Sequence, residues 1–468
     1  MKGKDFDTKT RVLDELLGVG RCFDMVSRFL QIGKQRAKLW AVNGYVVDEL
    51  LERMISVWLA VDSLRDVPDL QSFVERYVSA GDAQVETSQD RAVTAVFAGK
   101  TLLVLEGYAG CVLIDAKEFP TREVNEPDSS KVLRGSHDGF VENIMCNAAL
   151  LRRRIRDPRL TLERHQVSER SRTDVALCYM KGLADEKLLD DLRQKLGSIE
   201  ARSIAMGQES IAESIAPRQW YNPFPKVRYI ERPDVATACI MEGDVLLMVD
   251  NSPAVMVLPV TLFRFTEEIN DYYFPPLVGT YLQIVRLAVV LLTIFITPVW
   301  FLLVKEPGRA AGMLSFIAIG EDYSVPLIVQ LFLVELIIDV LKLASLNTPN
   351  VFSNSFSVLG ALILGDFAVQ SRWLVPEVVV YMAFVAIANY AQHSYEMGYA
   401  FKLCRMALLL LVWALDWWGL AIGTVGILVL IVTTRPIGGG GYLYPLLPFN
   451  GKALLRLLHR QHISRHNT

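Results

Sequence analysis

The sequence predicts a two-part protein, in which an α/β N-terminal region of two subdomains precedes an α-helical transmembrane domain. The chain of 468 residues is longer than one ordinary domain needs, and 52% of it is hydrophobic, with a mean hydropathy of +0.29. Charged residues are frequent up to about residue 270, whereas long apolar runs dominate beyond about residue 281. Two similar strand–turn–strand segments also occur in the first part.

The first 60 residues are expected to be mainly helical from about residue 10. "RCFDMVSRFL" and "VVDELLERMISVWLAV" place apolar residues three and four positions apart, as an amphipathic helix does. "KLWAVNGY", which lies between them, is typical of a short strand. We therefore expect helix, strand and helix in this order.

Two later segments resemble each other closely enough to predict related β-hairpins. "FAGKTLLVLEGYAGCVLI" and "MEGDVLLMVDNSPAVMVL" each indicate a strand, a polar turn and a second strand. In this alignment Gly99 matches Gly243 and Glu106 matches Asp250. The similarity indicates two α/β subdomains, although independent convergence on hairpin chemistry is an alternative.

Between the hairpins, "SHDGFVENIMCNAALLRRRIRDPRL" predicts an amphipathic helix that Asp157-Pro158 should end. Its apolar stripe at steps of three or four comprises Phe140, Ile144, Ala148, Leu151 and Ile155. Next, "RHQVSERSRTDVALCYMKG" predicts a strand pair, and "DEKLLDDLRQKLGSI" an amphipathic helix.

The basic end of the first of these helices has three interpretations. Arginines near a helix C-terminus are favoured by the helix dipole and can form salt bridges with nearby acids. No aromatic platform accompanies them, so nucleic acid is not an expected partner. The third interpretation is docking to another subunit or to lipid headgroups. The candidate docking residues are Arg152, Arg153, Arg154 and Arg156.

The cysteine pattern and the N-terminal segment both indicate a reducing compartment. The six cysteines are scattered, with no CxxC pair, which predicts buried free thiols. "MKGKDFDTKTRVLDELLG" lacks the apolar core of a signal peptide, so we expect the first half to stay on the cytoplasmic side.

Four apolar segments in the second half are candidate membrane spans. They cover residues 282–304, 351–370, 375–391 and 403–434, and the last is either one tilted helix or a hairpin that turns near "DWWG". The segment 325–346 is helical in pattern but carries Glu335, Asp339 and Lys342 on one face. We expect it to be amphipathic, re-entrant or interfacial, with a plain fifth span as the alternative.

An even number of spans fits a cytoplasmic start and a basic, cytoplasmic C-terminal tail. Four spans would place Lys402 and Arg405 on the opposite side, which the positive-inside rule disfavours. Ser353, Ser357 and Gly360 form one line in the second span, so it is either a tight helix–helix seam or a pore lining.

Catalytic motifs are missing from the sequence. We find no P-loop, HExxH, Gly-x-Ser-x-Gly or kinase signature, and thus expect no enzyme activity and no cofactor. Glu335, Asp339 and Asp366 are acidic enough for a metal site, but no histidine lies at ligand spacing, so no metal is expected.

Several of these segments together resemble the A-subunit family of bacterial spore germinant receptors, the GerA family. They are "GFVENIMCNAALLRRRIRDPRL", the stretch from "PRQWYNPFPKVRYIERPD" to "FRFTEEINDYY", and "SVLGALILGDFAVQSRWLVPEVVVYMAFVAIAN". The resemblance covers nearly the whole chain, from about residue 18 to residue 450. Receptor A subunits tend to have Gln where this chain has Asp366, a departure that argues against direct nutrient sensing.

The resemblance implies a multi-pass protein of the endospore inner membrane that acts in germination. It implies N-terminal subdomains at residues 1–120 and 121–270 on the spore-core side, a membrane domain at 271–450 and a basic tail at 451–468. Its implied partners are the lipid bilayer, further copies of the chain, other germination membrane proteins and germinant receptor subunits.

Family members are thought to form oligomers that let monovalent cations cross the membrane. The resemblance then predicts an ion path and a gate or mouth, and neither a solute transporter, for which no inverted repeat is evident, nor a non-conducting scaffold is excluded. The path residues are Ser353, Ser357, Gly360 and Asp366, and the gate residues are Glu335 and Asp339. A nutrient receptor A subunit is a further alternative.

Overall fold

The computed structural model divides into two compact units. It describes residues 2–46, 48–117, 135–199, 204, 206–268, 274–305, 317, 319, 323–347, 368–390, 392 and 394–458. The α/β unit comprises Met1–Pro217, Val227–Val260 and Ile437–Gly439. The helical unit comprises Arg218–Lys226, Thr261–Pro436 and Gly440–Thr468.

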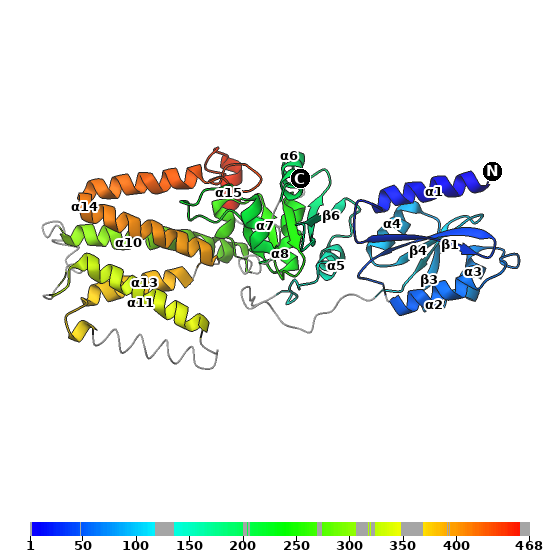
Figure 1. The fold of residues 1–468 in the computed structure, drawn as a ribbon, viewed down its shortest axis with the longest axis horizontal. Coiled ribbons are helices and arrows are strands. Elements are labelled where there is room, and N and C mark those ends of the chain that lie inside the picture. Colours follow the sequence, from blue (N-terminus) through cyan, green and yellow to red (C-terminus); the bar gives the residue numbers. More distant parts are fainter. Residues whose placement is uncertain are drawn as a thin grey trace. The chain divides into compact units, whose positions relative to one another are not determined.

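The first half of the α/β unit is built on a five-stranded antiparallel sheet with the order β1-β2-β4-β5-β3 (Figure 1). Its strands are β1 (Met25–Ile32), β2 (Gln35–Val42), β3 (Ala83–Glu86), β4 (Thr101–Leu105) and β5 (Cys111–Ile114). Its helices are α1 (Lys2–Leu17), α2 (Asp48–Leu59), α3 (Leu70–Tyr77) and α4 (Gln89–Phe97).

The second half repeats this plan with the order β6-β7-β9-β10-β8. Its strands are β6 (Leu160–Val167), β7 (Thr173–Met180), β8 (Arg228–Ile230), β9 (Val245–Val249) and β10 (Val255–Leu258). Its helices are α5 (Ile144–Arg154), α6 (Glu186–Gly197), α7 (Gln208–Ile215) and α8 (Pro233–Glu242). Both halves therefore run helix, hairpin, two helices, strand, helix, hairpin.

The two predicted hairpins are confirmed as β4–β5 and β9–β10, and they are the last parts of a repeat that covers each whole half. Gly99 and Gly243 both follow a helix with positive φ, at +98° and +101°, a conformation that glycine adopts without steric cost. In β4, Leu102 and Leu103 pack into two different hydrophobic clusters, because successive side chains point to opposite faces of the sheet.

One prediction for the first half is wrong. "RCFDMVSRFL" does not form a helix, since residues from Met25 onward belong to β1, which pairs with β2 along its whole length. β1 is an edge strand with a broken burial pattern, so Phe29 is 62% exposed while Leu30 is buried. This segment forms a strand because it pairs with β2, although its apolar spacing is typical of a helix.

The basic segment forms a shorter helix than predicted. α5 begins at Ile144, where the side chain of Asn143 accepts hydrogen bonds from two backbone N–H groups, and it ends at Arg154. Phe140 precedes the helix and yet lies in the same hydrophobic cluster as the rest of the stripe. The predicted strand pair and the amphipathic helix that follow are confirmed as β6–β7 and α6.

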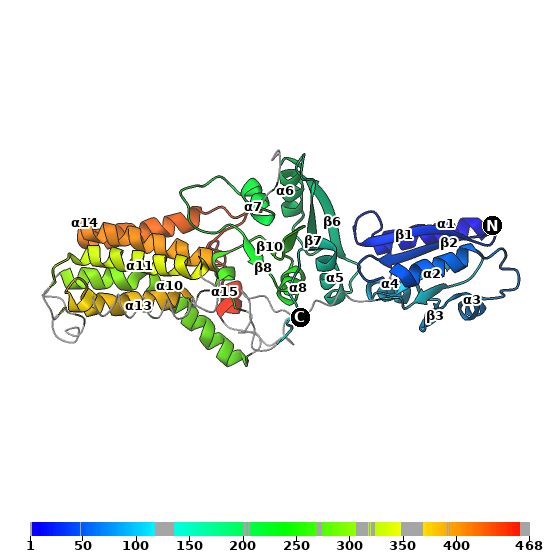
Figure 2. The same cartoon turned by 60° about the horizontal axis from the view of Figure 1, so that its bottom comes forward.

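The helical unit is a bundle of apolar helices (Figure 2). Its main helices are α10 (Pro276–Lys305), α11 (Leu327–Asn347), α13 (Pro376–Tyr390) and α14 (Tyr395–Thr433), with η1 (Leu262–Phe265) before them and α15 (Gly451–Leu458) after them. Within the described residues, α10 and α14 are long and apolar enough to cross a membrane. The expected four spans are thus not confirmed, and residues 351–367 of the second lie outside the described residues.

α14 is a hairpin of two helical arms. Asp416 has φ of 53° and ψ of −127°, so the helix breaks there. A Cβ added at Gly419 would overlap the Leu411 carbonyl, and one at Gly423 would overlap the Leu408 side chain. These contacts pair residues on either side of Asp416 in antiparallel order, and Figure 1 shows the two arms joined at one end. The hairpin alternative near "DWWG" is therefore confirmed over the single tilted helix.

Candidate functional site

Inside the helical unit, two acidic residues of α11 and two basic residues of α14 form one charge cluster. Arg405 Nη2 donates hydrogen bonds to both carboxylate oxygens of Glu335, each at 2.8 Å. Lys402 Nζ lies 3.1 Å from Glu335 Oε1. Lys402 also pairs with Asp339. The acids are four residues apart and the cations three, so each pair lies on one face of its helix. We call these four residues the α11–α14 cluster.

The α11–α14 cluster is largely removed from solvent. The exposed fraction of the side chain is 0% for Arg405, 6% for Lys402 and Glu335, and 32% for Asp339. Arg405 Nη1 also donates to the backbone carbonyl of Thr293 on α10, at 3.1 Å. The cluster thus joins three helices, and loss of one member would leave a partner charge buried without compensation.

Hydrogen bonding in the α11–α14 cluster is incomplete. Within the described residues, Asp339 Oδ1 and Arg405 Nε are buried without a hydrogen-bond partner, and Lys402 Nζ is held by its ion pairs alone. Buried polar atoms of this kind are uncommon and call for a physical reason, such as water or a second arrangement of the cluster.

The charged face of α11 is turned toward α14. Lys342, its third charged residue, lies over the Tyr399 ring of α14, with the ammonium 5.4 Å from the ring centroid. The amphipathic, re-entrant, interfacial and spanning interpretations of this segment stay predictions, since α11 is not among the candidate spans of the described residues.

Sequence reasoning missed Lys402 and Arg405 as members of this site. From the sequence, these two residues were treated as exceptions to the positive-inside rule, on the assumption that they face water. Because their charges are neutralised inside the bundle, they carry no weight in a count of loop charges. The available signal was the match of two acids on one apolar segment with two cations on another.

The predicted ion path cannot be compared with the structure, since Ser353, Ser357, Gly360 and Asp366 lie outside the described residues. Of the predicted gate, Glu335 and Asp339 are both described and both belong to the α11–α14 cluster. No group of three or more potential metal ligands occurs in the part of the chain that the structure describes.

Arg152 has a structural position that does not suit docking to another subunit. Its side chain is 0% exposed, and its Nε and Nη2 donate to the Asp24 carboxylate at 2.9 and 3.1 Å. Nη1 donates to the Leu160 carbonyl at 2.9 Å, and the guanidinium lies 5.0 Å from the Phe97 ring centroid. Burial has the largest single effect and lowers the pKa of Arg152, but the charge of Asp24 and the hydrogen bonds to its carboxylate, with a smaller contribution from Cys22, together outweigh burial and raise the pKa. Arg152 thus joins the two sheets of the α/β unit.

The other candidate docking residues are more accessible. Arg154 pairs with Asp138 at 2.6 Å and is about one-quarter exposed, while Arg153 and Arg156 are exposed. The salt-bridged interpretation therefore applies to Arg152 and Arg154. Docking by Arg153 and Arg156 stays a prediction.

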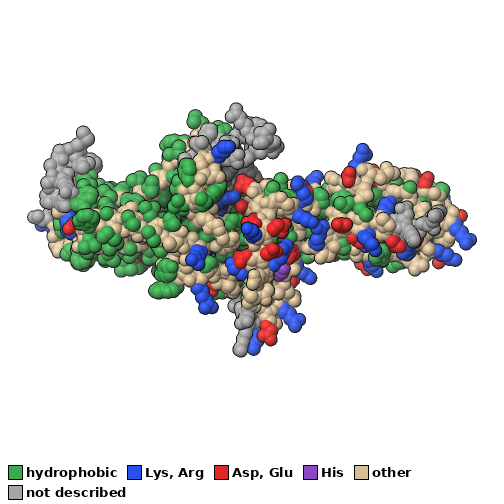
Figure 3. Space-filling model, turned by 90° about the horizontal axis from the view of Figure 1, so that it is seen from above, with side chains coloured by type: hydrophobic (Ala, Val, Ile, Leu, Met, Phe, Trp, Pro, Cys, Tyr) green, Lys and Arg blue, Asp and Glu red, His purple; other side chains and the backbone are tan. Residues whose placement is uncertain are grey.

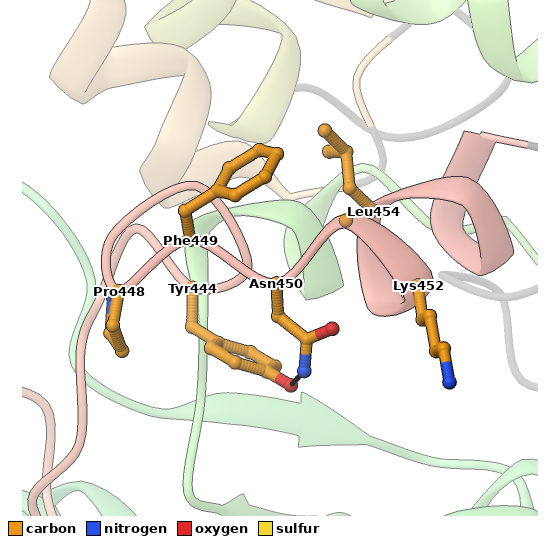
Figure 4. Close-up of a pocket in the computed structure, with 7 residues that line it drawn as sticks. Tyr444, Pro448, Phe449, Asn450, Lys452 and Leu454 are labelled. Carbon is orange, nitrogen blue, oxygen red and sulfur yellow. Dashed lines mark hydrogen bonds between the residues drawn. The ribbon is translucent and has the colours of Figure 1, made fainter.

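A hollow lies where the segment before α15 meets the first turn of that helix. Its lining residues are Tyr444, Pro448, Phe449, Asn450, Gly451, Lys452 and Leu454. Asn450 Nδ2 donates to the Tyr444 hydroxyl at 3.0 Å on one side of it, while Phe449 and Leu454 point to the other side (Figure 4). Its open, mainly apolar lining has one charged residue, Lys452, so the α11–α14 cluster remains the better candidate for chemistry that involves charge.

The duplicated α/β unit and the apolar helical unit with buried charges define a class of membrane-associated protein with a large polar N-terminal part. Within this class, the chain belongs to the Bacillus/Clostridium GerA spore germination protein family, whose model matches residues 12–468. A role in spore germination follows from this membership. The family resemblance stated from the sequence is confirmed.

Two relatives and one solved structure illustrate the similarity. Stage V sporulation protein AF of Bacillus subtilis (strain 168) is 36% identical over 445 residues, which cover 95% of this chain and 90% of that protein. In the sequence, "GDFAVQSRWLVPEVVVYMAFVAIAN" and "YPLLPFNGKALLRLL" resemble this branch of the family. Spore germination protein KA of the same strain is 26% identical, with 94% and 82% covered. The N-terminal domain of the A subunit of the Bacillus megaterium spore germinant receptor GerK3 has 23% identity and a TM-score of 0.41, covering 53% of this chain and 92% of that one.

Proposed function

We propose that this chain is an inner-membrane component of the germination machinery whose copies assemble around a path for monovalent cations. The α/β unit lies on the spore-core side, and the chain has no catalytic role. The path is the one predicted at Ser353, Ser357, Gly360 and Asp366, and the α11–α14 cluster is its gate. Other germination membrane proteins and receptor subunits act with it.

The observation that carries this proposal is the internal neutralisation of Glu335 and Asp339 by Lys402 and Arg405. Ionised side chains among apolar helices are costly and commonly mark ion pathways. Buried ion pairs add little net stability, so a role as a switch is a better reason to keep them. While α11 and α14 stay in contact, the carboxylates have no free charge to offer a passing cation.

Separation of α11 from α14 would release that charge. Two carboxylates without their internal partners attract hydrated cations, and the attraction grows in the low-dielectric surroundings of a helix bundle. The incomplete hydrogen bonding of Asp339 and Arg405 is consistent with a cluster that has a second arrangement. Opening the gate therefore means that the carboxylates exchange the side-chain cations of Lys402 and Arg405 for monovalent cations from solution.

The test replaces Lys402 by Met in the full chain, reconstituted into potassium-loaded vesicles. Lys402→Met keeps the apolar stem and frees Asp339, so we expect faster basal potassium efflux than from the wild type. Adding Asp366→Asn should lower this efflux again. Size-exclusion chromatography of each variant checks that it folds and assembles.

Lys38→Met is the matched control, because Lys38 has the same exposed side-chain fraction of 6% and pairs with Asp14, but in the α/β unit. It should leave the efflux unchanged. Wild-type efflux from a correctly assembled Lys402→Met chain would contradict the gate. If every variant, including Asp366→Asn, also supported normal ion release in spores, the scaffold alternative would replace the channel.

A further inference from the structure

The loop Arg218–Lys226 belongs by sequence to the N-terminal half, and by structure to the helical unit. Its first part is attached to the C-terminal end of α14. Gln219 Nε2 donates to the Thr433 carbonyl at 3.1 Å, and Gln219 Oε1 accepts from the Arg435 N–H at 3.3 Å. Asn222 Nδ2 donates to the Thr434 hydroxyl at 2.7 Å. These bonds place the loop where the second arm of α14 ends.

The second part of the loop is held by aromatic packing. Phe224 is 2% exposed, and its ring centroid lies 6.0 Å from that of Phe401 and 6.2 Å from that of Tyr442. The Tyr442 hydroxyl donates to the Pro225 carbonyl at 2.9 Å. The loop is therefore fixed on both sides of residues 220 and 221.

Between these fixed points the loop exposes its largest aromatic side chains. Trp220 is 96% exposed and Tyr221 is 58% exposed, with their rings edge to face at a centroid distance of 6.4 Å. Arg218 and Arg435 on either side are exposed as well. Trp and Tyr combine an apolar ring with a polar group, and are therefore enriched at the boundary between lipid headgroups and acyl chains.

The position of the loop along α14 fits such a boundary. The second arm runs from Trp417 to Thr433, about 17 residues, or about 26 Å at the rise of an α-helix, close to the hydrocarbon thickness of a bilayer. Trp418 is 76% exposed at its first end, and Trp220 lies at its other end. The large exposed side chains between these ends are apolar: Ile422, Val425, Leu428, Val429 and Val432. Figure 3 shows hydrophobic side chains gathered over the helical unit.

We propose that Trp220 and Tyr221 form a lipid anchor, which inserts at the headgroup boundary of the leaflet where α14 ends. Arg218 and Arg435 lie where they can contact lipid phosphates. The occupant is the bilayer because the apolar exposed surface continues along the second arm of α14 and ends at this aromatic pair. This inference depends on the membrane placement of the helical unit proposed above, though not on ion conduction.

Nitroxide labels on the full chain in phosphatidylcholine vesicles test this anchor. Trp220→Cys is labelled in a Cys146→Ser background, since the other five cysteines are buried. We expect the label to collide more often with oxygen, which dissolves in lipid, than with a water-soluble nickel chelate. A label at Met206→Cys, 76% exposed in the α/β unit, should favour the nickel chelate.

Leu428→Cys, at a position 52% exposed on the second arm, separates the anchor from the membrane placement on which it depends. If the Leu428 label favours oxygen and the Trp220 label behaves like the Met206 label, the placement stands and the anchor is wrong. A Trp220 label shielded from both reagents would mean that a protein covers the loop, which also overturns the proposal. If the Leu428 label favours nickel, the placement itself fails.

Discussion

Two groups of buried charges among the described residues, Arg152 with Asp24 in the α/β unit and the α11–α14 cluster in the helical unit, differ in how completely their polar atoms are hydrogen-bonded. In the α/β unit, all three guanidinium nitrogens of Arg152 donate hydrogen bonds, and the Asp24 side chain is buried with it. In the α11–α14 cluster, two acids share two cations, Asp339 stays about one-third exposed, and three polar atoms have no hydrogen-bond partner among the described residues. The first arrangement suits a permanent joint between two sheets, and the second suits a contact that can open.

The comparison also shows that burial alone does not indicate a gate. Both clusters lie in apolar surroundings, and both join elements far apart in the sequence. They differ in the free energy needed to separate the charged partners. Separation costs more for Arg152 and Asp24, because a fully hydrogen-bonded pair loses every bond at once. Substitutions that remove one partner measure this difference.

The largest expected effect is on the joint of the α/β unit. Arg152→Met leaves Asp24 buried and unpaired, which should lower the free energy of unfolding by about 3–5 kcal/mol. Urea unfolding followed by the fluorescence of Trp40 and Trp58, both buried in this unit, measures the loss. The double variant Arg152→Met, Asp24→Asn should recover part of it. A loss below about 1 kcal/mol, typical of surface pairs, would show that the joint is dispensable.

A smaller effect is expected in the α11–α14 cluster. Arg405→Met leaves Glu335 with Lys402 as a remaining partner, so the stability of the detergent-solubilised chain should fall less than in Arg152→Met. A double-mutant cycle with Glu335→Gln should give a coupling energy of about 0.5–3 kcal/mol. Thermal unfolding, monitored by circular dichroism, provides the four values. A loss that exceeds that of Arg152→Met would break the contrast between joint and gate.

The smallest effect concerns a partly exposed pair, Glu163 with Arg193, which serves as the water-facing reference. Partial burial has the largest single effect and raises the pKa of Glu163, but the hydrogen bonds and charge of Arg193, with a smaller contribution from His165, together outweigh burial and lower the pKa. A lowered folded-state pKa means that the pair stabilises the fold above the unfolded pKa of about 4.3 and loses this contribution as pH falls through the folded value.

Glu163→Gln should therefore cost about 0.2–1 kcal/mol at neutral pH and progressively less below about pH 4. Unfolding of wild type and variant in parallel between neutral and acidic pH measures this difference. A cost that grew on acidification would mean that the pKa of Glu163 is raised, contrary to the geometry.

Local patterns in the sequence were sufficient where a segment's structure depends on its near neighbours. The hairpins at Leu102 and Leu246 and the helix α6 were predicted, and the turn near Asp416 was one of two stated alternatives, since turn residues and periodicity act over a few positions. The strand β1 was not, because an edge strand is defined by its partner. The GxxxG pattern of Gly419 and Gly423 was a readable signal for the close α14 hairpin that went unused.

By itself, the sequence determined the division into a polar and an apolar half, the repeated hairpins and the membership of a germination family. Only the tertiary structure decided that the repeat covers two whole sheets, that Arg152 faces Asp24, and that Lys402 and Arg405 face Glu335. The physical reason is distance along the chain. Composition and periodicity report the solvent a segment prefers, whereas a buried charge selects its partner from residues that only folding brings within a few ångströms.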